Sequence, residues 1–113
     1  MEVTPGRWLK LTSECIKALP NESGVFEVAN LVRTVVYIGS GDGRLRDRIE
    51  AFGPVPSGLP PAVGGHYFRY ELTDNEDETI RRRLKGYRRE HGGSLPVGNM
   101  RAEHPDTERK HAA

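Results

Sequence analysis

The feature that most constrains the fold is a pair of β-rich segments separated by a brief connection. Residues 24–30 read GVFEVAN and residues 33–39 read RTVVYIG. β-branched and aromatic residues favour strands, and so short a connection favours an antiparallel hairpin. The second segment carries apolar residues on both of its alternating faces, which predicts a central strand that is covered on both sides.

Three helices and one further strand complete the predicted pattern. The expected helices cover residues 12–19, 45–52 and about 74–90, and the third strand covers residues 66–72. This order predicts the α+β type of the α/β class: a small, mainly antiparallel three-stranded sheet flanked by helices. We assign it to a single domain, residues 1–100. Residues 101–113 are polar and carry no apolar stripe, which predicts a flexible tail.

Local signals support these helix boundaries. The side chains suited to cap the three helices are Thr12 or Ser13, Asp42, and Thr73 or Asp74. The last helix carries Ile80, Leu84 and Tyr87 at the spacing of one helix face, which predicts a stripe facing the core. The segment SLPVGN at 94–99 is expected to close the domain in an extended conformation.

The composition limits the classes of protein. Hydrophobic residues make up 35% of the chain and charged residues 29%, and no apolar run is long enough to span a bilayer. Neither a membrane partner nor a secretory signal is therefore expected. Cys15 is the only cysteine, which excludes an intrachain disulfide and favours a cytoplasmic location.

Basic residues are concentrated in parts of the chain although the net charge is only +1. Residues 81–89 read RRRLKGYRR, and residues 44–48 read RLRDR. Local basic fields attract phosphate even when the total charge is near zero. The predicted nucleic-acid contacts are Arg44, Arg81, Arg82, Lys85 and Arg88; a solvated helix face is the alternative interpretation.

Two residues near the glycine-rich turn GSGDG at 39–43 are candidates for chemistry. The neighbours of Arg48 three and four positions away include no carboxylate, so its guanidinium is a candidate anion clamp. A packed stem with a solvated head is the alternative. Tyr37 lies just before the turn, where sites are built, although a strand tyrosine is more often part of a core.

These segments together resemble the GIY-YIG nuclease family. Gly24-Val25-Phe26 corresponds to the GIY tripeptide and Tyr37-Ile38-Gly39 to YIG. The family's following helix has the form L-x-x-R-hydrophobic-x-x-aromatic, and residues 45–52 read LRDRIEAF. The resemblance is good over residues 19–52 and looser over residues 66–99.

The resemblance implies an endonuclease that hydrolyses phosphodiester bonds with one divalent metal, usually Mg²⁺. Tyr37 would orient the attacking water and Arg48 would stabilise the scissile phosphate. Glu78 would hold the metal, and Asn99 would close the site. The implied partner is nucleic acid, DNA rather than RNA, and a homodimer or a partner protein is expected to help in target choice.

The chain also departs from the family pattern. Phe26 replaces the tyrosine of GIY, and the position expected for the metal-binding carboxylate falls within Arg81–Arg83. Glu76 and Asp77 are interpreted as favourable charges at a helix N-terminus. The alternative hypothesis is therefore a catalytically degenerate module that binds nucleic acid or a protein partner without cleavage.

Overall fold

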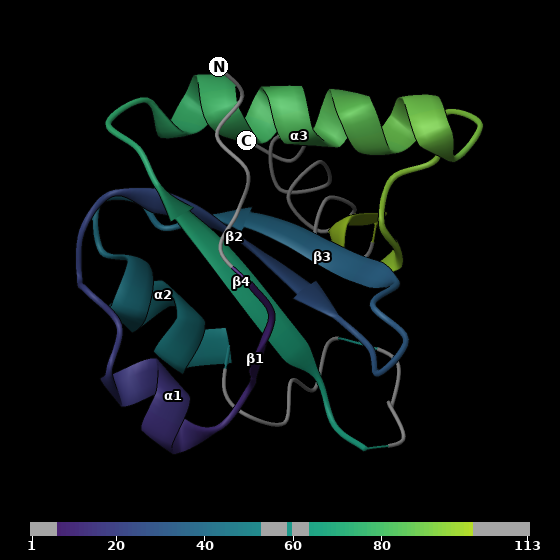
Figure 1. Cartoon of the computed structure of the whole chain (residues 1–113). Coiled ribbons are helices and arrows are strands. Elements are labelled where there is room, and N and C mark those ends of the chain that lie inside the picture. The colour runs from purple at the N-terminus through teal and green to yellow at the C-terminus, as the bar shows by residue number, and fades with distance from the viewer. Residues whose placement is uncertain (1–6, 53–58, 60–63, 101–113) are drawn as a thin grey trace, which may run out of the picture.

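The computed structural model describes residues 7–52, 59 and 64–100. The predicted tail, residues 101–113, lies outside the described residues. The elements are β1 (Leu9–Lys10), α1 (Ser13–Lys17), β2 (Gly24–Ala29), β3 (Val35–Ser40), α2 (Leu45–Phe52), β4 (Tyr67–Leu72) and α3 (Glu76–Glu90) (Figure 1). A short helical turn at 97–100 follows α3, so the extended conformation predicted for residues 94–99 is wrong at its end.

The strands form one antiparallel sheet in the order β1-β4-β2-β3. The predicted hairpin is confirmed, since β2 pairs with β3 from Val25 opposite Ser40 to Ala29 opposite Val35. The described sheet has four strands rather than three because Leu9–Lys10 adds to β4. A two-residue strand is too short to give an alternating pattern in the sequence.

The prediction that β3 is a central strand is wrong. Among the described strands β3 pairs with β2 alone and lies at an edge of the sheet, while β2 occupies the interior beside β4. The apolar character of both faces of β3 has another cause, because α3 contacts one face and the aromatic core lies on the other. Coverage of both faces does not require a strand partner on both sides.

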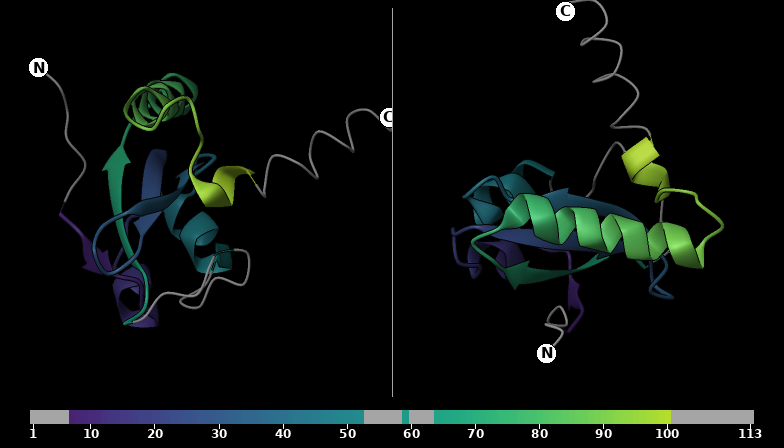
Figure 2. Two further views of the ribbon diagram at one scale, coloured as in Figure 1. Left: turned by 90° about the vertical axis from the view of Figure 1, so that its right-hand side faces the viewer. Right: turned by 90° about the horizontal axis from the view of Figure 1, so that it is seen from above.

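The molecule has three layers (Figures 1 and 2). α3 crosses one face of the sheet, and α1 and α2 lie together against the other. Phe26 and Val28 of β2, Phe68 of β4, and Leu45 and Ile49 of α2 form the centre of the apolar core on the α1–α2 side. These positions alternate along the strands and are four apart on the helix, as amphipathic elements require.

Charged side chains make most of the contacts described here between α3 and the face of the sheet that it covers. Arg83 of α3 forms ion pairs with Glu27 of β2 and Glu71 of β4, and Arg69 of β4 donates to Glu27 over 2.8 Å. Glu27 and Glu71 are both buried, at 6% and 8% exposure. We call these four residues the ionic layer.

The predicted apolar stripe of α3 is therefore wrong. Thr79 is the buried residue of this helix, and the residues predicted to face the core line two surface pockets instead: Ile80, Leu84 and Tyr87. Arg83 occupies the azimuth that points at the sheet, because it lies four residues after Thr79.

The helix caps differ in part from the prediction. Thr12 caps α1 as expected, its hydroxyl accepting from Cys15 N–H. Asn75 caps α3 instead of Thr73 or Asp74. The start of α3 therefore lies one or two residues later than predicted, and the helix itself is present as expected.

α2 is capped from a distant segment rather than by Asp42. The Asn21 side chain accepts from Asp47 N–H, and the Glu22 carbonyl accepts from Leu45 N–H. Asp42 instead has a positive φ of 53° and lies in the turn before the helix. Its backbone conformation directs its carboxylate elsewhere, as described below.

Candidate functional site

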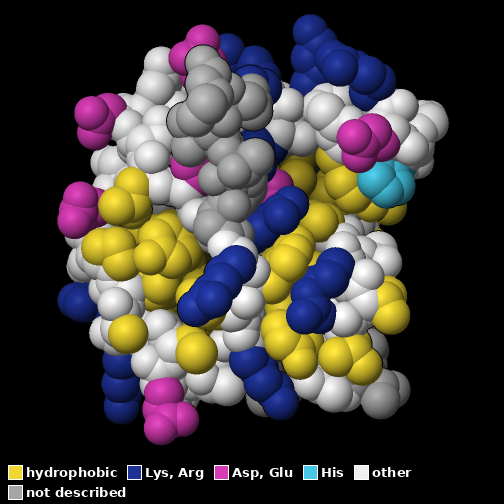
Figure 3. Space-filling view, in the orientation of Figure 1, with side chains coloured by type: hydrophobic (Ala, Val, Ile, Leu, Met, Phe, Trp, Pro, Cys, Tyr) yellow, Lys and Arg dark blue, Asp and Glu magenta, His cyan; other side chains and the backbone are white. Residues whose placement is uncertain are grey.

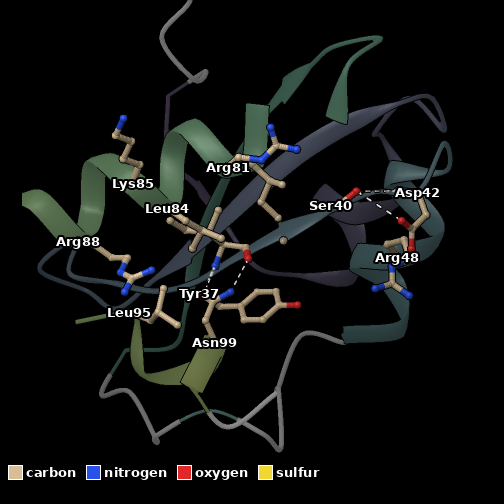
Figure 4. Close-up of a pocket in the computed structure, with 13 residues that line it drawn as sticks. Tyr37, Ser40, Asp42, Arg48, Arg81, Leu84, Lys85, Arg88, Leu95 and Asn99 are labelled. Atoms are coloured by element: carbon tan, nitrogen blue, oxygen red, sulfur yellow. Dashed lines mark hydrogen bonds and ion pairs between the residues drawn. The ribbon is translucent and has the colours of Figure 1, made fainter. Parts of the chain in front are cut away.

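A pocket of about 590 Å³ lies beside β3, the edge strand of the described sheet, and is bounded by α3, the turn before α2, and the segment after α3 (Figure 4). We call it the edge pocket. The residues that line it are Tyr37, Ile38, Gly39, Ser40, Asp42, Arg48, Ile80, Arg81, Leu84, Lys85, Arg88, Leu95 and Asn99. Ser40, Asp42 and Arg48 lie at one end, Leu84, Leu95 and Arg88 at the other, and Tyr37 between them.

Four cations from two helices line the edge pocket. Arg48 comes from α2, and Arg81, Lys85 and Arg88 come from α3, where spacings of four and three residues place them on one face. All four residues are exposed. Asp42 is the only carboxylate among the described lining residues. The pocket is therefore electropositive in a protein of nearly zero net charge.

Two of the five predicted nucleic-acid contacts lie elsewhere. Arg44 is exposed but does not line the edge pocket. Arg82 points to the opposite side of α3, where it pairs with Glu71 at 4.0 Å. The run of basic residues in the sequence is thus divided by helix geometry into one group at the pocket and another at the ionic layer.

Tyr37 combines a packing role with a position at the pocket. Its ring stacks on Phe52 at 5.0 Å between centroids and lies 5.8 Å from Phe26. Gly39 is required beneath these rings, because an added Cβ would lie 2.6 Å from Tyr37 Cε2 and 2.9 Å from Phe26 Cζ. The glycine of the YIG-like tripeptide thus accommodates the two aromatic rings.

Arg48 has a carboxylate partner that helix spacing alone does not reveal. Its Nε lies 3.6 Å from Asp42 Oδ2, and both side chains are at least half exposed. Asp42 has a positive φ and lies in the turn before α2, beside Arg48 (Figure 4). An exposed pair of this kind contributes little to stability, so the guanidinium is available to exchange a carboxylate for a phosphate oxygen.

Asn99 occupies the edge of β3. Its Oδ1 accepts from Ile38 N–H and its Nδ2 donates to Ile38 C=O, both at 2.8 Å. A side-chain amide presents one donor and one acceptor side by side, so here it replaces a neighbouring strand. Gly98 allows this close approach, because a Cβ would collide with Leu59 and with the Val36 carbonyl. Asn99 lines the pocket, as predicted, with its amide committed to the backbone.

Glu78 does not reach the edge pocket. Its carboxylate is exposed at the start of α3 and accepts from Asn75 Nδ2 at 3.0 Å. It is absent from the described lining residues, so the structure does not bring it near Tyr37 and Arg48.

Glu76, expected only to complement the helix N-terminus, is the carboxylate of α3 that contacts the glycine-rich turn. Its Oε2 accepts from the N–H groups of Gly24 and Gly43, at 2.8 and 2.9 Å, and its Oε1 accepts from Ser40 Oγ at 3.0 Å. Burial of the carboxylate opposes ionisation, but these donors, with Asp42 N–H, outweigh it and lower the pKa of Glu76. Glu76 thus joins α3 to the glycine-rich turn.

The described residues do not fit the single-metal site that the resemblance implies. The oxygens of Glu76 already accept three hydrogen bonds from the turn and β2, Asp42 pairs with Arg48, and Glu78 lies outside the pocket. No group of three or more His, Cys, Asp or Glu side chains that could hold a metal ion is present in the described part of the chain.

A second pocket, of about 540 Å³, lies under the other end of α3 and differs in charge. Its charged lining residues are Arg33, Arg69, Arg82, Arg83, Glu27 and Glu90. Arg69 and Arg83 pair there with Glu27, and Arg82 lies 4.0 Å from Glu71. On the face of the molecule that is turned to the viewer in Figure 3, further Lys and Arg side chains lie with hydrophobic side chains between them. Arg33 lies 4.2 Å from the Tyr67 ring centroid and Arg69 lies 4.3 Å from that of Trp8. The edge pocket is therefore the better anion site.

Comparisons with known proteins add a family assignment. In the described residues no helix has the length and apolar character needed to cross a membrane. Neither the curated proteins nor the solved structures contain a match to the chain. A family model, Domain of unknown function (DUF7508), matches residues 1–90, which is most of the chain. The chain therefore belongs to the DUF7508 family.

Proposed function

We propose that the domain binds nucleic acid through its phosphates in the edge pocket, without metal-dependent cleavage. The observation that carries the proposal is the convergence of Arg48, Arg81, Lys85 and Arg88 on one pocket whose described lining holds a single carboxylate. Arg81 and Arg88 are separated by about 10 Å along the helix axis, since an α-helix rises about 1.5 Å per residue. That length is enough to contact more than one phosphate of a strand.

The proposal keeps the GIY-YIG-like interpretation of the fold and takes its non-catalytic alternative. Phe26 has no hydroxyl and is buried in the core, so one hydroxyl of the family's tyrosine pair is missing. The carboxylates near the pocket are already bonded to N–H groups, a hydroxyl or a guanidinium. We retain DNA as the preferred nucleic acid, and a second copy or a partner protein as the source of target choice.

Binding is tested by fluorescence anisotropy with labelled DNA and RNA across a series of salt concentrations. We expect Arg81→Ala/Lys85→Ala to weaken binding and to reduce the slope of log K against log salt by about 1.4–1.8, because each phosphate that a cation neutralises adds roughly 0.7–0.9 to that slope. Lys17→Ala/Arg89→Ala is the control, because it removes the same charge from exposed residues outside the pocket. Equal weakening by the two double variants would contradict the assignment of the pocket.

An endonuclease remains the second candidate, because Tyr37 and Arg48 line the same pocket as that mechanism requires. The test incubates supercoiled plasmid with the protein in Mg²⁺ or in EDTA. The binding proposal predicts no nicking in either condition. Nicking that needs Mg²⁺ and disappears in Arg48→Ala would replace the binding module with the enzyme.

A further inference from the structure

The edge pocket contains more apolar surface than phosphate binding alone requires. Ile80, Leu84 and Leu95 line it, and each is only partly buried. In Figure 4 Leu84 and Leu95 lie beside Tyr37, with Lys85 and Arg88 on one side and Arg81 above. A concave apolar surface ringed by a few charged groups is typical of a small-molecule site rather than of a flat contact with a duplex backbone.

Two polar side chains that line the pocket, Asn99 and Ser40, are already bonded within the protein. Both atoms of the Asn99 amide bond the backbone of Ile38. Ser40 Oγ donates to Glu76 and accepts from Asp42 N–H. Reading a base requires donors and acceptors that can turn to its edge, and a group that is already bonded must first give up its present partner. These side chains therefore offer little discrimination between bases.

The size of the pocket limits what enters it. Its volume of about 590 Å³ falls within the range of small-ligand sites, which is suited to one nucleotide and too small for a base pair with its two backbones. A base that is stacked and paired in a duplex does not expose its faces to aliphatic side chains. An unpaired nucleotide exposes both faces and its phosphates.

We infer that the edge pocket accommodates one unpaired nucleotide of a single strand, without selecting the base. The base lies against Ile80, Leu84 and Leu95, and its flanking phosphates contact Arg48 and the cations of α3. This inference rests on the proposed function and specifies the form of nucleic acid that is bound.

The test compares four fluorescent probes with the same number of phosphates per strand: oligothymidylate, oligodeoxyadenylate, an abasic tetrahydrofuran strand, and a duplex. We expect the two base-containing strands to bind with similar affinity. Both should bind about tenfold more tightly than the abasic strand, the factor given by ~1.4 kcal/mol of apolar burial. The duplex should resemble the abasic strand.

Substitutions test whether the apolar side chains of the edge pocket cause the preference for base-containing strands. Leu84→Ser should reduce the ratio of oligothymidylate to abasic affinity and leave the abasic affinity unchanged. Leu84→Met should preserve the ratio, and so should Leu72→Ser, which alters an exposed leucine outside the pocket. Because the ratio is measured on one protein sample, partial unfolding would lower both affinities and not the ratio.

The outcomes separate this inference from the proposed function. Equal binding of abasic and base-containing strands, or tighter binding of the duplex, would overturn the inference while phosphate binding stands. If no probe binds wild type more tightly than it binds Arg81→Ala/Lys85→Ala, both the inference and the proposed function fail.

Discussion

Glu76 connects three segments that are far apart in the sequence. Its carboxylate, at the start of α3, accepts hydrogen bonds from N–H groups of β2 and of the glycine-rich turn and from the Ser40 hydroxyl. Hydrogen bonds to a charged group are each worth about 1.5–3 kcal/mol, more than those between neutral groups. Glu76 therefore holds the turn that positions Asp42 beside Arg48.

The lowered pKa of Glu76 gives a prediction about pH. Because its folded pKa lies below the unfolded value of about 4.3, its contribution is complete above that value and is lost as pH falls through the folded pKa. We expect Glu76→Gln to lower the free energy of unfolding by about 1–2 kcal/mol at pH 7. Urea denaturation of both proteins from pH 7 down to pH 3 measures the difference.

That difference should shrink as the pH falls from the unfolded pKa of about 4.3 through the lower folded pKa, because the wild-type carboxyl group then becomes protonated as well. A difference that stays constant over the whole range would mean that the carboxylate charge does not contribute. Subtracting the free energy of unfolding of one protein from that of the other removes the effect of the other titrating carboxylates, which are common to both.

At the scale of elements, α3 is attached to the sheet by the ionic layer. Glu27 and Glu71 are buried beneath Arg83, whose side chain is only 12% exposed. A buried ion pair gains little over an apolar contact of the same shape, but removal of one partner leaves a charge unpaired. The ionic layer therefore fixes where α3 lies more than it adds to stability.

This view predicts opposite results for partial and complete removal of the layer. Arg83→Met should lower the free energy of unfolding by about 3–5 kcal/mol, because both glutamates lose their shared partner. The quadruple variant Glu27→Leu/Arg69→Met/Glu71→Leu/Arg83→Met should recover most of that loss, since none of the four charges of the layer is left without its partner. Urea unfolding of wild type, Arg83→Met and the quadruple variant is the measurement, and a quadruple variant less stable than Arg83→Met would contradict this explanation.

The elements themselves were largely predictable, whereas their partners were not. The hairpin, α2 and α3 follow from alternation, glycine punctuation and helix periodicity, which are local properties. The position of β3 at the sheet edge was not predictable, because the alternation of Val36, Tyr37 and Ile38 reports burial of the faces and not the presence of a neighbouring strand. The ionic layer was missed because Glu27 and Arg83 are remote in sequence.

At the scale of the whole molecule, most residues of the candidate site were predictable, whereas their contact partners were not. Tyr37, Arg48, Arg81, Lys85, Arg88 and Asn99 were expected at the site, and all six line the edge pocket. Arg44, Arg82 and Glu78 were also expected there and do not line it. Arg82 and Glu78 lie on other sides of α3, because each residue of a helix is rotated by about 100° from the one before it. The Arg48–Asp42 pair depends on a positive φ in a non-glycine residue, which spacing rules do not anticipate.

The net charge of the whole molecule favours a local rather than a long-range attraction of phosphates. A net charge of +1 produces a weak field at a distance, so the cations of the edge pocket act on phosphates within roughly one Debye length, about 8–10 Å at physiological salt. The control variant Lys17→Ala/Arg89→Ala tests this point together with the binding proposal, since it changes the total charge and leaves the pocket intact.

The amide that closes the sheet edge lies beyond residue 90, where the family match ends. A protein shortened to residues 1–90 keeps every described strand of the sheet but uncovers a ready template for strand addition by other molecules. We expect such a fragment to polymerise over hours, with rising light scattering and thioflavin fluorescence, while the 113-residue chain keeps a constant size. The folding unit would then extend past the limit of the family match, at least as far as Asn99.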